Sequence, residues 1–516
     1  MEKPPQKMEK LQEIGEKRKR IQQGGGEGAV QKLLRSRGKL TAWERIELLF
    51  DRGTFREIGL WTRPVKTGFE SIDQAQVPRD AMIAGYGEVD GRMVYATSYD
   101  PTVYGGSQAA MQFEKLGKTM QQAREEGVPY VGMIDSGGRR IQDLFGRWSY
   151  RAPTRLPGCE EGALDMVCPP LASGVVPQIS LILGPSVAGT AYSPVMADFV
   201  FFRKGTSHMA VASPQLLKAV TFKDVTWEEI GGATLHATTT GTCDLLAESD
   251  EEAIGKCREL LGFLPSNWRE RPPSRATQDD PNRKEEELLS ILPVDGDQPY
   301  AIHRIIALMV DDGRFFELQP LYASHLVIGF ARLAGEVVGL VANNPMVKQG
   351  SLDANACDKE ARFIRFCDAF NIPLIFLVDT PGFLPSAEME QSREGLARHA
   401  AKSIYAICES SVPSVVIYLG RCFGAGRLIM GTREMGIDAA FAWPGGQIRL
   451  DHPGSPQGKD SWGKDFEEPY CSAAHLAVDD IIDPRETRPI LVNTLSRLAK
   501  KQPPARPWKK HGLISL

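Results

Sequence analysis

Two pairs of small residues, Ala188–Gly189 and Gly424–Ala425, have the composition of loops that bind a ligand through the backbone. Without bulky side chains, the peptide N–H groups of such loops approach a ligand closely. Two N–H groups aimed at one point form an oxyanion hole, which stabilises charge that develops on a carbonyl oxygen, and loss of one donor costs about 3 kcal/mol. Two pairs therefore predict two holes and acyl transfer between two carbonyl-bearing partners.

Both pairs stand at the same place in a pattern that occurs twice, about 240 residues apart. One isolated pair would more simply permit close packing of a helix on a sheet, but a repeated pair at fixed spacing favours a site. Three spacings are identical: six residues from Pro129 to Asp135 and from Pro373 to Asp379, seven from Pro177 to Gly184 and from Pro413 to Gly420, and four from each glycine to its pair.

Each copy reads as a helix, a buried strand, a glycine turn, a second helix, a second buried strand and a small-residue loop. Upstream of each copy a β-hairpin is predicted, turning at Asp90–Gly91 and at Ala334–Gly335. Residues 266–287 are polar and proline-rich, which predicts a linker. The chain is thus expected to consist of two homologous α/β domains, residues 1–280 and 281–516.

The composition of the chain argues against several classes of function. A net charge of −4 with dispersed basic residues gives no reason to expect nucleic acid, and no apolar run approaches the ~20 residues that span a bilayer. The N-terminus lacks the apolar core of a signal peptide. Nine cysteines without a CxxC pair indicate reduced thiols in the cytoplasm and no metal site, and Cys367 is interpreted as a small buried residue.

No conventional catalytic set is present. The motifs of serine hydrolases, P-loop enzymes, zinc peptidases and dinucleotide-binding folds are missing, and the eight histidines are scattered. His399, on a predicted helix, is interpreted as a packed or capping residue. A site made of backbone amides fits this sequence best.

The chain closely resembles the carboxyltransferase (β) subunits of biotin-dependent acyl-CoA carboxylases, together with the carboxyltransferase subunit of methylmalonyl-CoA decarboxylase. The resemblance covers nearly the whole chain and rests on DSGG, DTPGFLP, GEVDGRMVYA, YSPVMADF, LDANACDKEARFIRFCDAFNIP and AWP. It implies two tandem crotonase-like domains with a duplicated ββα superhelix, active sites built by two subunits, and a hexamer.

The resemblance also implies which ligand each domain binds. The N-terminal domain would bind a coenzyme A thioester, with Ala188 and Gly189 at the enolate oxygen. The C-terminal domain of a neighbouring subunit would bind biotin, with Gly424 and Ala425 at its ureido oxygen. Substrate contacts are expected from Gly137, Gly138, Arg139, Arg151, Tyr192, Phe383, Gln447 and Arg449. Because no biotinylation motif or ATP-binding loop is present, the biotin carrier and biotin carboxylase are expected on separate chains.

Several residues depart from the family pattern. Arg139 stands where alanine is common, residues 143–171 are longer than usual and include Arg151, and Gln447, Arg449 and Arg427 place polar groups in the usually apolar biotin half. Three hypotheses follow: carboxyl transfer between biotin and an acyl-CoA in either direction, a biotin-independent decarboxylase of a malonyl-type thioester, and a non-catalytic scaffold subunit.

Overall fold

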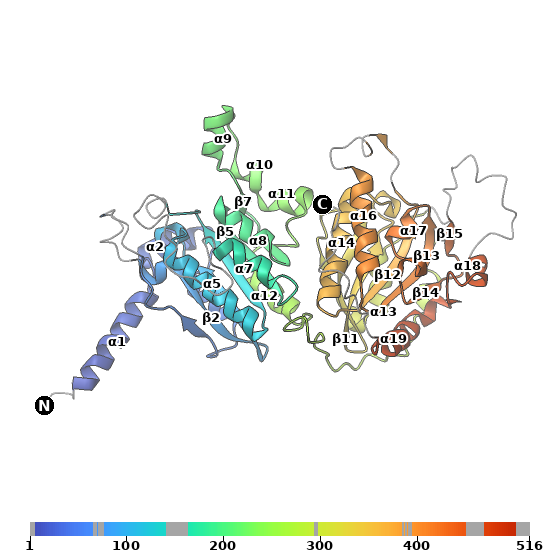
Figure 1. Cartoon of the computed structure of the whole chain (residues 1–516), viewed down its shortest axis with the longest axis horizontal. Coiled ribbons are helices and arrows are strands. Elements are labelled where there is room, and N and C mark those ends of the chain that lie inside the picture. The colour runs from blue at the N-terminus through green and yellow to red at the C-terminus, as the bar shows by residue number, and fades with distance from the viewer. Residues whose placement is uncertain are drawn as a thin grey trace, which may run out of the picture. The chain divides into compact units, whose positions relative to one another are not determined.

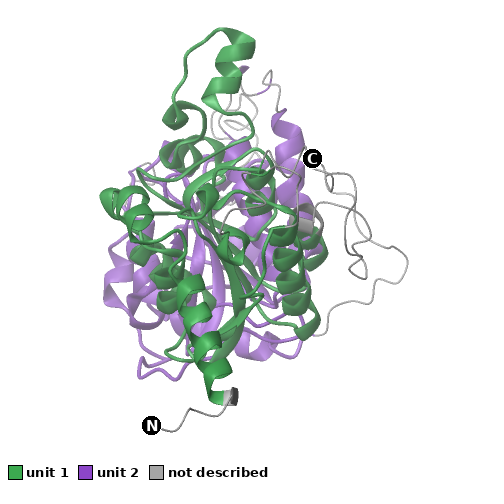
Figure 2. Ribbon diagram, turned by 90° about the vertical axis from the view of Figure 1, so that its left-hand side faces the viewer, with its two compact units in different colours: residues 1–262 green, residues 263–516 purple. Residues whose placement is uncertain are grey.

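The protein is represented by a computed structural model that describes residues 6–64, 70, 77–140, 164–293, 298–383, 386–387, 390, 395–449 and 469–501. The chain forms two compact units, residues 1–262 and 263–516 (Figures 1 and 2). Each unit is built around one mixed eight-stranded sheet.

The sheet of the first unit has the strand order β1-β2-β3-β4-β5-β6-β8, and β7 pairs with the end of β5. The first three strands are antiparallel and the others join in parallel. The strands are β1 (Arg56–Ile58), β2 (Met82–Val89), β3 (Arg92–Tyr99), β4 (Tyr130–Ser136), β5 (Gln178–Val187), β6 (Phe199–Arg203), β7 (His208–Ala210) and β8 (Leu245–Ala247).

Helices of the first unit begin and end at residues suited to those positions. Thr41 and Glu44 form a capping box at the start of α3, and α5 ends at Gly127 in the left-handed conformation (φ 68°). The helices are α1 (Gln6–Gln22), α2 (Glu27–Leu33), α3 (Ala42–Leu49), α5 (Ala110–Glu126), α7 (Leu164–Ala172), α8 (Gly189–Val195), α9 (Pro214–Thr221), α10 (Trp227–Gly231), α11 (Ala233–Leu235) and α12 (Asp250–Leu261).

The second unit repeats this topology, with the strand order β9-β10-β11-β12-β13-β14-β16 and β15 on the end of β13. Its strands are β9 (Phe315–Leu318), β10 (Leu326–Leu333), β11 (Glu336–Asn343), β12 (Leu374–Thr380), β13 (Ser414–Phe423), β14 (Ala439–Ala442), β15 (Gln447–Arg449) and β16 (Asp480–Ile481). Its helices are α13 (Ile302–Met309), α14 (Ala354–Ala369), α16 (Leu396–Glu409), α17 (Gly426–Ile429), α18 (Tyr470–Ala474) and α19 (Thr487–Leu498). The predicted duplication and both hairpins are confirmed.

Packing explains two of the repeated spacings. Each repeated proline immediately precedes a strand, and the two strands of each copy pair in parallel from their first residues. This register brings the aspartate of one strand against the glycine of the next. A Cβ on Gly184 would lie 1.9 Å from Asp135 Oδ1, and one on Gly420 would lie 2.9 Å from the Asp379 carboxyl group. The aspartate and glycine positions therefore belong to the core.

The buried aspartates are held by cations. Asp135 lies 2.5 Å from Lys39 Nζ and 3.0 Å from an Arg45 nitrogen, and Asp379 lies 2.9 Å from Arg421 Nε. Removing one partner of such a buried pair typically costs 3–5 kcal/mol, about the stability of a small domain. These carboxylates fix the ends of β4 and β12.

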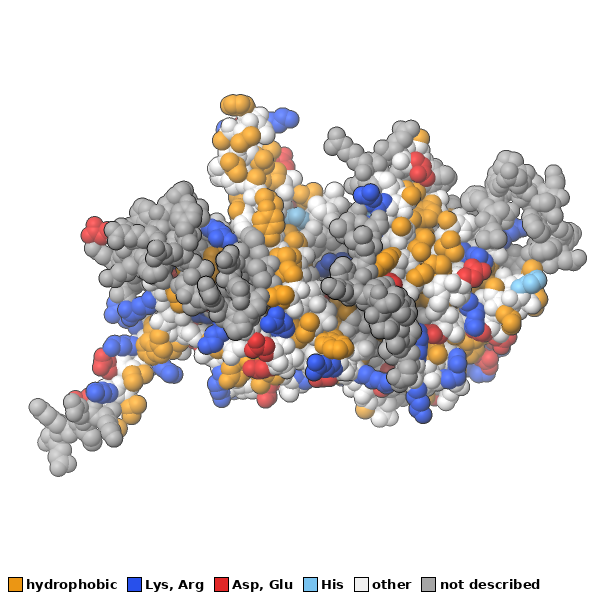
Figure 3. Space-filling view, viewed as in Figure 1, with side chains coloured by type: hydrophobic (Ala, Val, Ile, Leu, Met, Phe, Trp, Pro, Cys, Tyr) orange, Lys and Arg blue, Asp and Glu red, His pale blue; other side chains and the backbone are white. Residues whose placement is uncertain are grey.

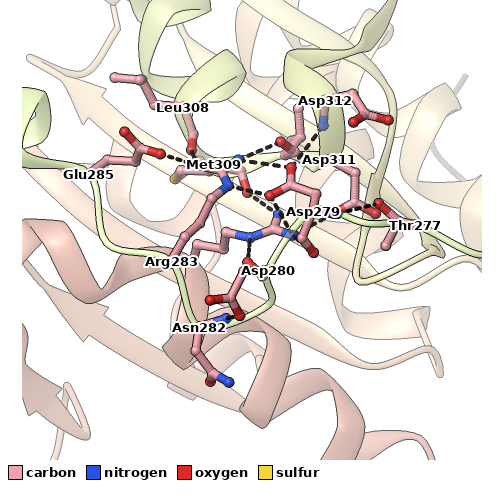
Figure 4. A network of polar contacts seen from close by, with 12 residues as sticks. Thr277, Asp279, Asp280, Asn282, Arg283, Glu285, Leu308, Met309, Asp311 and Asp312 are labelled. Carbon is pink, nitrogen blue, oxygen red and sulfur yellow. Dashed lines mark hydrogen bonds and ion pairs between the residues drawn. The ribbon is translucent and has the colours of Figure 1, made fainter.

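The segment predicted as a linker, residues 266–287, belongs to the second unit and is fastened to it. The Asn371 side chain donates a hydrogen bond to the Trp268 carbonyl (2.7 Å), and Arg283 Nε donates to Asp279 (2.5 Å) within the network of Figure 4. Polar, proline-rich composition is typical of a free linker, but here it supplies partners for backbone carbonyls. The linker prediction was wrong because sequence composition does not distinguish these cases.

Within the described residues, no helix is long and apolar enough to cross a membrane.

Candidate active site

The loop between β5 and α8 has an unusual backbone. Ala188 adopts φ 55° and ψ −120°, a region that alanine rarely occupies, and its N–H donates to the Ala210 carbonyl at 3.0 Å. Gly189 is the first residue of α8, so its N–H has no acceptor within the helix. Ala188 turns the chain, and Gly189 presents the N–H.

The loop between β13 and α17 has the same design. Gly424 adopts φ 56°, and its N–H donates to the Arg449 carbonyl at 2.9 Å. Ala425 then begins α17 as its N-cap residue. The N–H groups of Ala188 and Gly424 are thus already bonded in the structure. The second residue of each pair, Gly189 or Ala425, is the one placed to donate to a ligand.

A second N–H in the first unit comes from the turn after β4. Gln108 forms a parallel bridge with Arg139: its N–H donates to the Gly138 carbonyl (2.8 Å), and its own carbonyl accepts from the Arg140 N–H (2.7 Å). The Arg139 N–H shares a trans peptide with the Gly138 carbonyl and so points the opposite way. The turn lies close to the end of β5, because a Cβ on Gly138 would be 3.1 Å from the Val187 carbonyl oxygen.

The second unit repeats this arrangement too. Leu352 bridges Phe383, and the Leu352 N–H donates to the Gly382 carbonyl at 2.9 Å. The Phe383 N–H therefore points away from Leu352. A Cβ on Gly382 would lie 3.1 Å from the Phe423 carbonyl oxygen, the same distance as at Gly138. In each unit, therefore, the turn that contains Arg139 or Phe383 lies close to the end of the strand that leads into the small-residue loop.

An open cavity of about 440 Å³ adjoins α8 in the first unit. It is lined mainly by apolar groups of α8, the end of β7 and the segment α9–α11, namely Ala191, Tyr192, Val195, Met209, Ala210, Val211, Ala212, Leu217, Ile230 and His236. Apolar side chains also gather on the protruding α9 segment, where Val220 is 68 % and Phe222 is 89 % exposed (Figures 1 and 3). An open, mainly apolar cavity thus lies beside the helix that begins at Gly189.

Two histidines near this cavity are structural. His236 Nε2 lies 2.9 Å from the Met209 carbonyl oxygen, and burial lowers the pKa of its ring. His208 stacks on Trp227 with ring centroids 4.3 Å apart, and burial, assisted by Lys39, lowers its pKa to about 4. Both rings are therefore neutral near pH 7.

The other predicted contact residues of the first unit lie around the same loops. Gly137 and Gly138 form the turn after β4, with the Gly137 N–H bonded to the Gly105 carbonyl at 3.0 Å and Gly138 at φ 96°. Tyr192 lies on α8 and is 43 % exposed at the cavity. Arg151 and most of the 143–171 segment fall outside the described residues.

In the second unit, Gln447 and Arg449 lie on β15, opposite Arg421 and Phe423 of β13, with half-buried side chains. The Arg427 guanidinium pairs with Glu434 at 2.9 Å. Its charge is therefore compensated within the chain. Cys367 is fully buried, and burial raises the pKa of its thiol, which confirms a packing role.

Sequence reasoning missed Gln108. Its side chain is 2 % exposed and lies beside Gly189: a Cβ on that glycine would be 3.8 Å from Gln108 Oε1 and 3.2 Å from Arg139 Nε. The only sequence signal is its place in the repeat, where the second copy has Leu352. Among the described residues, no group of three or more His, Cys, Asp and Glu side chains is arranged to hold a metal ion.

Comparisons with known proteins identify the family. Residues 34–450 match the model of the carboxyl transferase domain. The chain is 40 % identical to the methylmalonyl-CoA decarboxylase subunit alpha of Veillonella parvula, over 98 % of this chain and 99 % of that one. It is 38 % identical to the propionyl-CoA carboxylase beta chain of Roseobacter denitrificans, with the same coverage.

Among solved structures, the chain is similar to transcarboxylase 12S, a hexamer that forms the substrate-binding core of a multienzyme and was crystallised with hydrolysed methylmalonyl-CoA. The TM-score is 0.92 at 38 % identity, over the full length of both chains.

Proposed function

The chain belongs to the carboxyl transferase family, and from this premise we propose that it moves a carboxyl group to or from the α-carbon of an acyl-CoA thioester. Its two units are tandem crotonase-like domains. The substrate class is that of the propionyl-CoA and methylmalonyl-CoA relatives, and the carboxyl carrier is biotin.

The observation that carries this proposal is the duplicated pair of backbone donors. Carboxyl transfer requires negative charge on two carbonyl oxygens, one on the thioester and one on the carrier. Two holes, each made of fixed N–H groups, meet that requirement, and preorganised donors of this kind are worth more inside a protein than in water. Gly189 and Arg139 would hold the thioester oxygen, and Ala425 and Phe383 the carrier oxygen.

The second hole would take the carbonyl oxygen of the biotin ring system, beside a turn that has no side chain. Glycine at position 382 leaves only 3.1 Å between a would-be Cβ and the Phe423 oxygen, so the turn has no room for a side chain on that side. Biotin, when bound, supplies the transferable carboxyl group and accepts the α-proton. This explains why the chain needs no ionisable base of its own: its residues bind, orient and stabilise charge.

Partners and location follow from the same assignment. We infer a homo-oligomer, a hexamer like the 12S relative, in which the thioester half of one subunit meets the biotin half of another. The biotin carrier and the biotin carboxylase are separate chains, and the complex works in the cytoplasm.

Proline substitutions test the two holes separately, because proline removes an N–H and is tolerated at the start of a helix. Ala425 has φ −68°, which proline adopts without strain. Each variant is assayed with propionyl-CoA and methylmalonyl-CoA, with and without a biotin carrier, by mass analysis of the thioesters. Thermal unfolding verifies that each variant is folded.

Loss of one donor should lower kcat by roughly 100-fold. Gly189→Pro should slow every reaction of the thioester by about this factor, whereas Ala425→Pro should slow only transfer that involves biotin. The matched controls, Gly189→Ala and Ala425→Ser, keep the N–H and should retain most activity. If Ala425→Pro leaves every activity unchanged, the protein is a biotin-independent decarboxylase; if the parent binds acyl-CoA without turnover, it is a scaffold subunit.

A further inference from the structure

In the second unit, α14 and α16 pack against each other, and α16 also contacts α17, whose N-cap residue is Ala425 (Figure 1). We propose that Glu360 on α14 makes this helix pair sensitive to pH. Its proton completes a hydrogen-bonded contact between α14 and α16, and release of that proton loosens α16. The contact itself follows from the structure, whereas its effect on the second hole rests on the proposed function.

The Glu360 carboxyl group lies in the interface between the two helices. It is fully buried, and neither oxygen has a hydrogen-bond partner of suitable geometry among the described residues. The Ser403 hydroxyl of α16 interacts with the carboxyl group but donates its proton to the Cys357 carbonyl of α14 at 3.0 Å. A hydroxyl that donates in this way still accepts. Protonated Glu360 can therefore donate to Ser403, while a carboxylate, which only accepts, has no donor as long as Ser403 is bonded to Cys357.

The surroundings of Glu360 favour its protonated form. Burial raises the pKa of Glu360 to about 8, and the Ser403 hydroxyl opposes this rise. From α14, the titratable group that interacts with Glu360 is the Cys357 thiol, whose own pKa is raised by burial and by Glu360. A carboxylate buried without a cation is strongly disfavoured. The interface is therefore most stable while Glu360 keeps its proton.

Charged groups near the start of α16 compensate one another. Asp358 of α14 lies 2.8 Å from His399 Nδ1 and 2.8 Å from Lys402 Nζ, and both of these residues are on α16. This cluster joins the two helices without the proton of Glu360. Because His399 is titratable as well, a variant of His399 is the control for any variant of Glu360.

Loss of the proton changes the contact between the helices. The carboxylate attracts the Ser403 proton, and the bond from Ser403 to the Cys357 carbonyl is then lost. If α16 moves away and water reaches the carboxyl group, the pKa of Glu360 returns to its ordinary value of 4.5. Between pH 4.5 and about pH 8, opening of α16 therefore releases a proton, and it becomes easier by up to about 10-fold per pH unit.

A looser α16 would affect the second hole through α17. The start of α17 packs closely on the turn after β12, because a Cβ on Gly426 would lie 2.8 Å from Gly382 Cα. Movement of α16 removes a neighbour of the helix that presents the Ala425 N–H. The first unit has no such device on α5, where Leu116 occupies the place of Glu360. The pH response is therefore expected in the second half alone.

Hydrogen–deuterium exchange of the full-length protein without substrate tests the contact. Between about pH 6 and about pH 8, protection of α16 amides, corrected for intrinsic exchange rates, should fall by up to about 10-fold per pH unit, while α5 keeps its protection. Glu360→Gln, which keeps the shape and a donor, and Glu360→Leu, which copies the first unit, should both remove the fall. His399→Gln should retain it.

A second measurement tests the effect on the second hole. Over the same pH range, biotin-dependent transfer by the parent should decline relative to transfer by Glu360→Gln, by at least about 3-fold in total. A ratio that stays constant would refute the link from α16 to the hole.

The exchange experiment decides the fate of the Glu360 contact by itself. Protection of α16 that is constant in the parent, or that falls equally in Glu360→Gln, would overturn the proposal; a fall that disappears only in His399→Gln would assign the response to the charged cluster instead. If no variant transfers a carboxyl group, the proposed function fails, but the exchange result for Glu360 still stands.

Discussion

The two loops proposed to form the oxyanion holes share a residue at positive φ but carry different side chains. Ala188 has φ 55° and donates its N–H to β7, which pairs with the end of β5. Gly424 has φ 56° and donates its N–H to β15, which pairs with the end of β13. Glycine accepts this conformation without strain, whereas alanine does so at a cost of about 1–3 kcal/mol. Both halves therefore have a residue at positive φ directly before Gly189 or Ala425. In the first half this residue is alanine, which disfavours that conformation.

Side chains around the loops differ much more than the main chain does. Arg139 has Phe383 as its counterpart, and Gln108 has Leu352. Contacts that hold the main chain in place are common to both halves. Lys115 on α5 and Lys359 at the equivalent place on α14 are both buried. Each donates hydrogen bonds to backbone carbonyls at or just before the start of the first long strand of its sheet, β2 or β10. The two halves are therefore more alike in main-chain geometry than in the side chains around the loops.

The largest difference between the halves is expected at the strand glycines. Gly184→Ala places a methyl group 1.9 Å from Asp135 Oδ1 and 2.7 Å from Lys39 Nζ, whereas Gly420→Ala places one 2.9 Å from the Asp379 carboxyl group. We expect the first substitution to disrupt the buried ion pairs and cost more than about 4 kcal/mol, and the second to cost about 1–3 kcal/mol. Denaturant unfolding measures both, and equal losses would contradict this account of the repeat spacing.

The next difference concerns Glu360, which occupies on α14 the place that Leu116 occupies on α5. Glu360 is fully buried, and burial raises its pKa from 4.5 to about 8. Between these two pH values the native protein keeps a proton that the unfolded chain has released. The free energy of unfolding should therefore fall as the pH rises through this window, with a slope of up to about 1.4 kcal/mol per pH unit.

Glu360→Leu should remove this slope and stabilise the protein by about 2 kcal/mol at pH 8. The reciprocal change, Leu116→Glu, should introduce a slope of the same sign in the first unit. Unfolding by denaturant at several pH values tests both variants. A slope that persists in Glu360→Leu would have to come from another group.

The smallest expected difference is at the loop residues themselves. Ala188→Gly should stabilise the protein by about 1 kcal/mol, and Gly424→Ala should destabilise it by about the same amount, because only the first removes an alanine from positive φ. Shifts in the denaturant midpoint measure these changes. Two effects of the same sign would show that the loops are less alike than their backbone angles indicate.

Much of this structure was predictable, because duplication makes a pattern visible in one sequence. Prolines that precede strands, glycine turns and paired small residues predicted the repeated topology and the hairpins, which the structure confirms, whereas the two oxyanion holes stay a prediction. The sequence did not reveal that the Asp–Gly spacing reflects a buried contact, or that residues 266–287 bind to the second unit. It also did not reveal Gln108, because its role depends on the bridge to Arg139 and on the rotamer that brings it to Gly189.

The donors of both proposed holes belong to the main chain, and this affects how such a protein can change over time. A substitution at position 108, 139, 352 or 383 alters what surrounds a hole but leaves every peptide N–H in place, unless the new residue is proline. The selectivity of the enzyme is therefore open to single mutational steps that spare its catalytic groups. An enzyme that depends on a serine or histidine side chain loses its reaction when that residue is replaced; here new substrates can be sampled while the old chemistry continues.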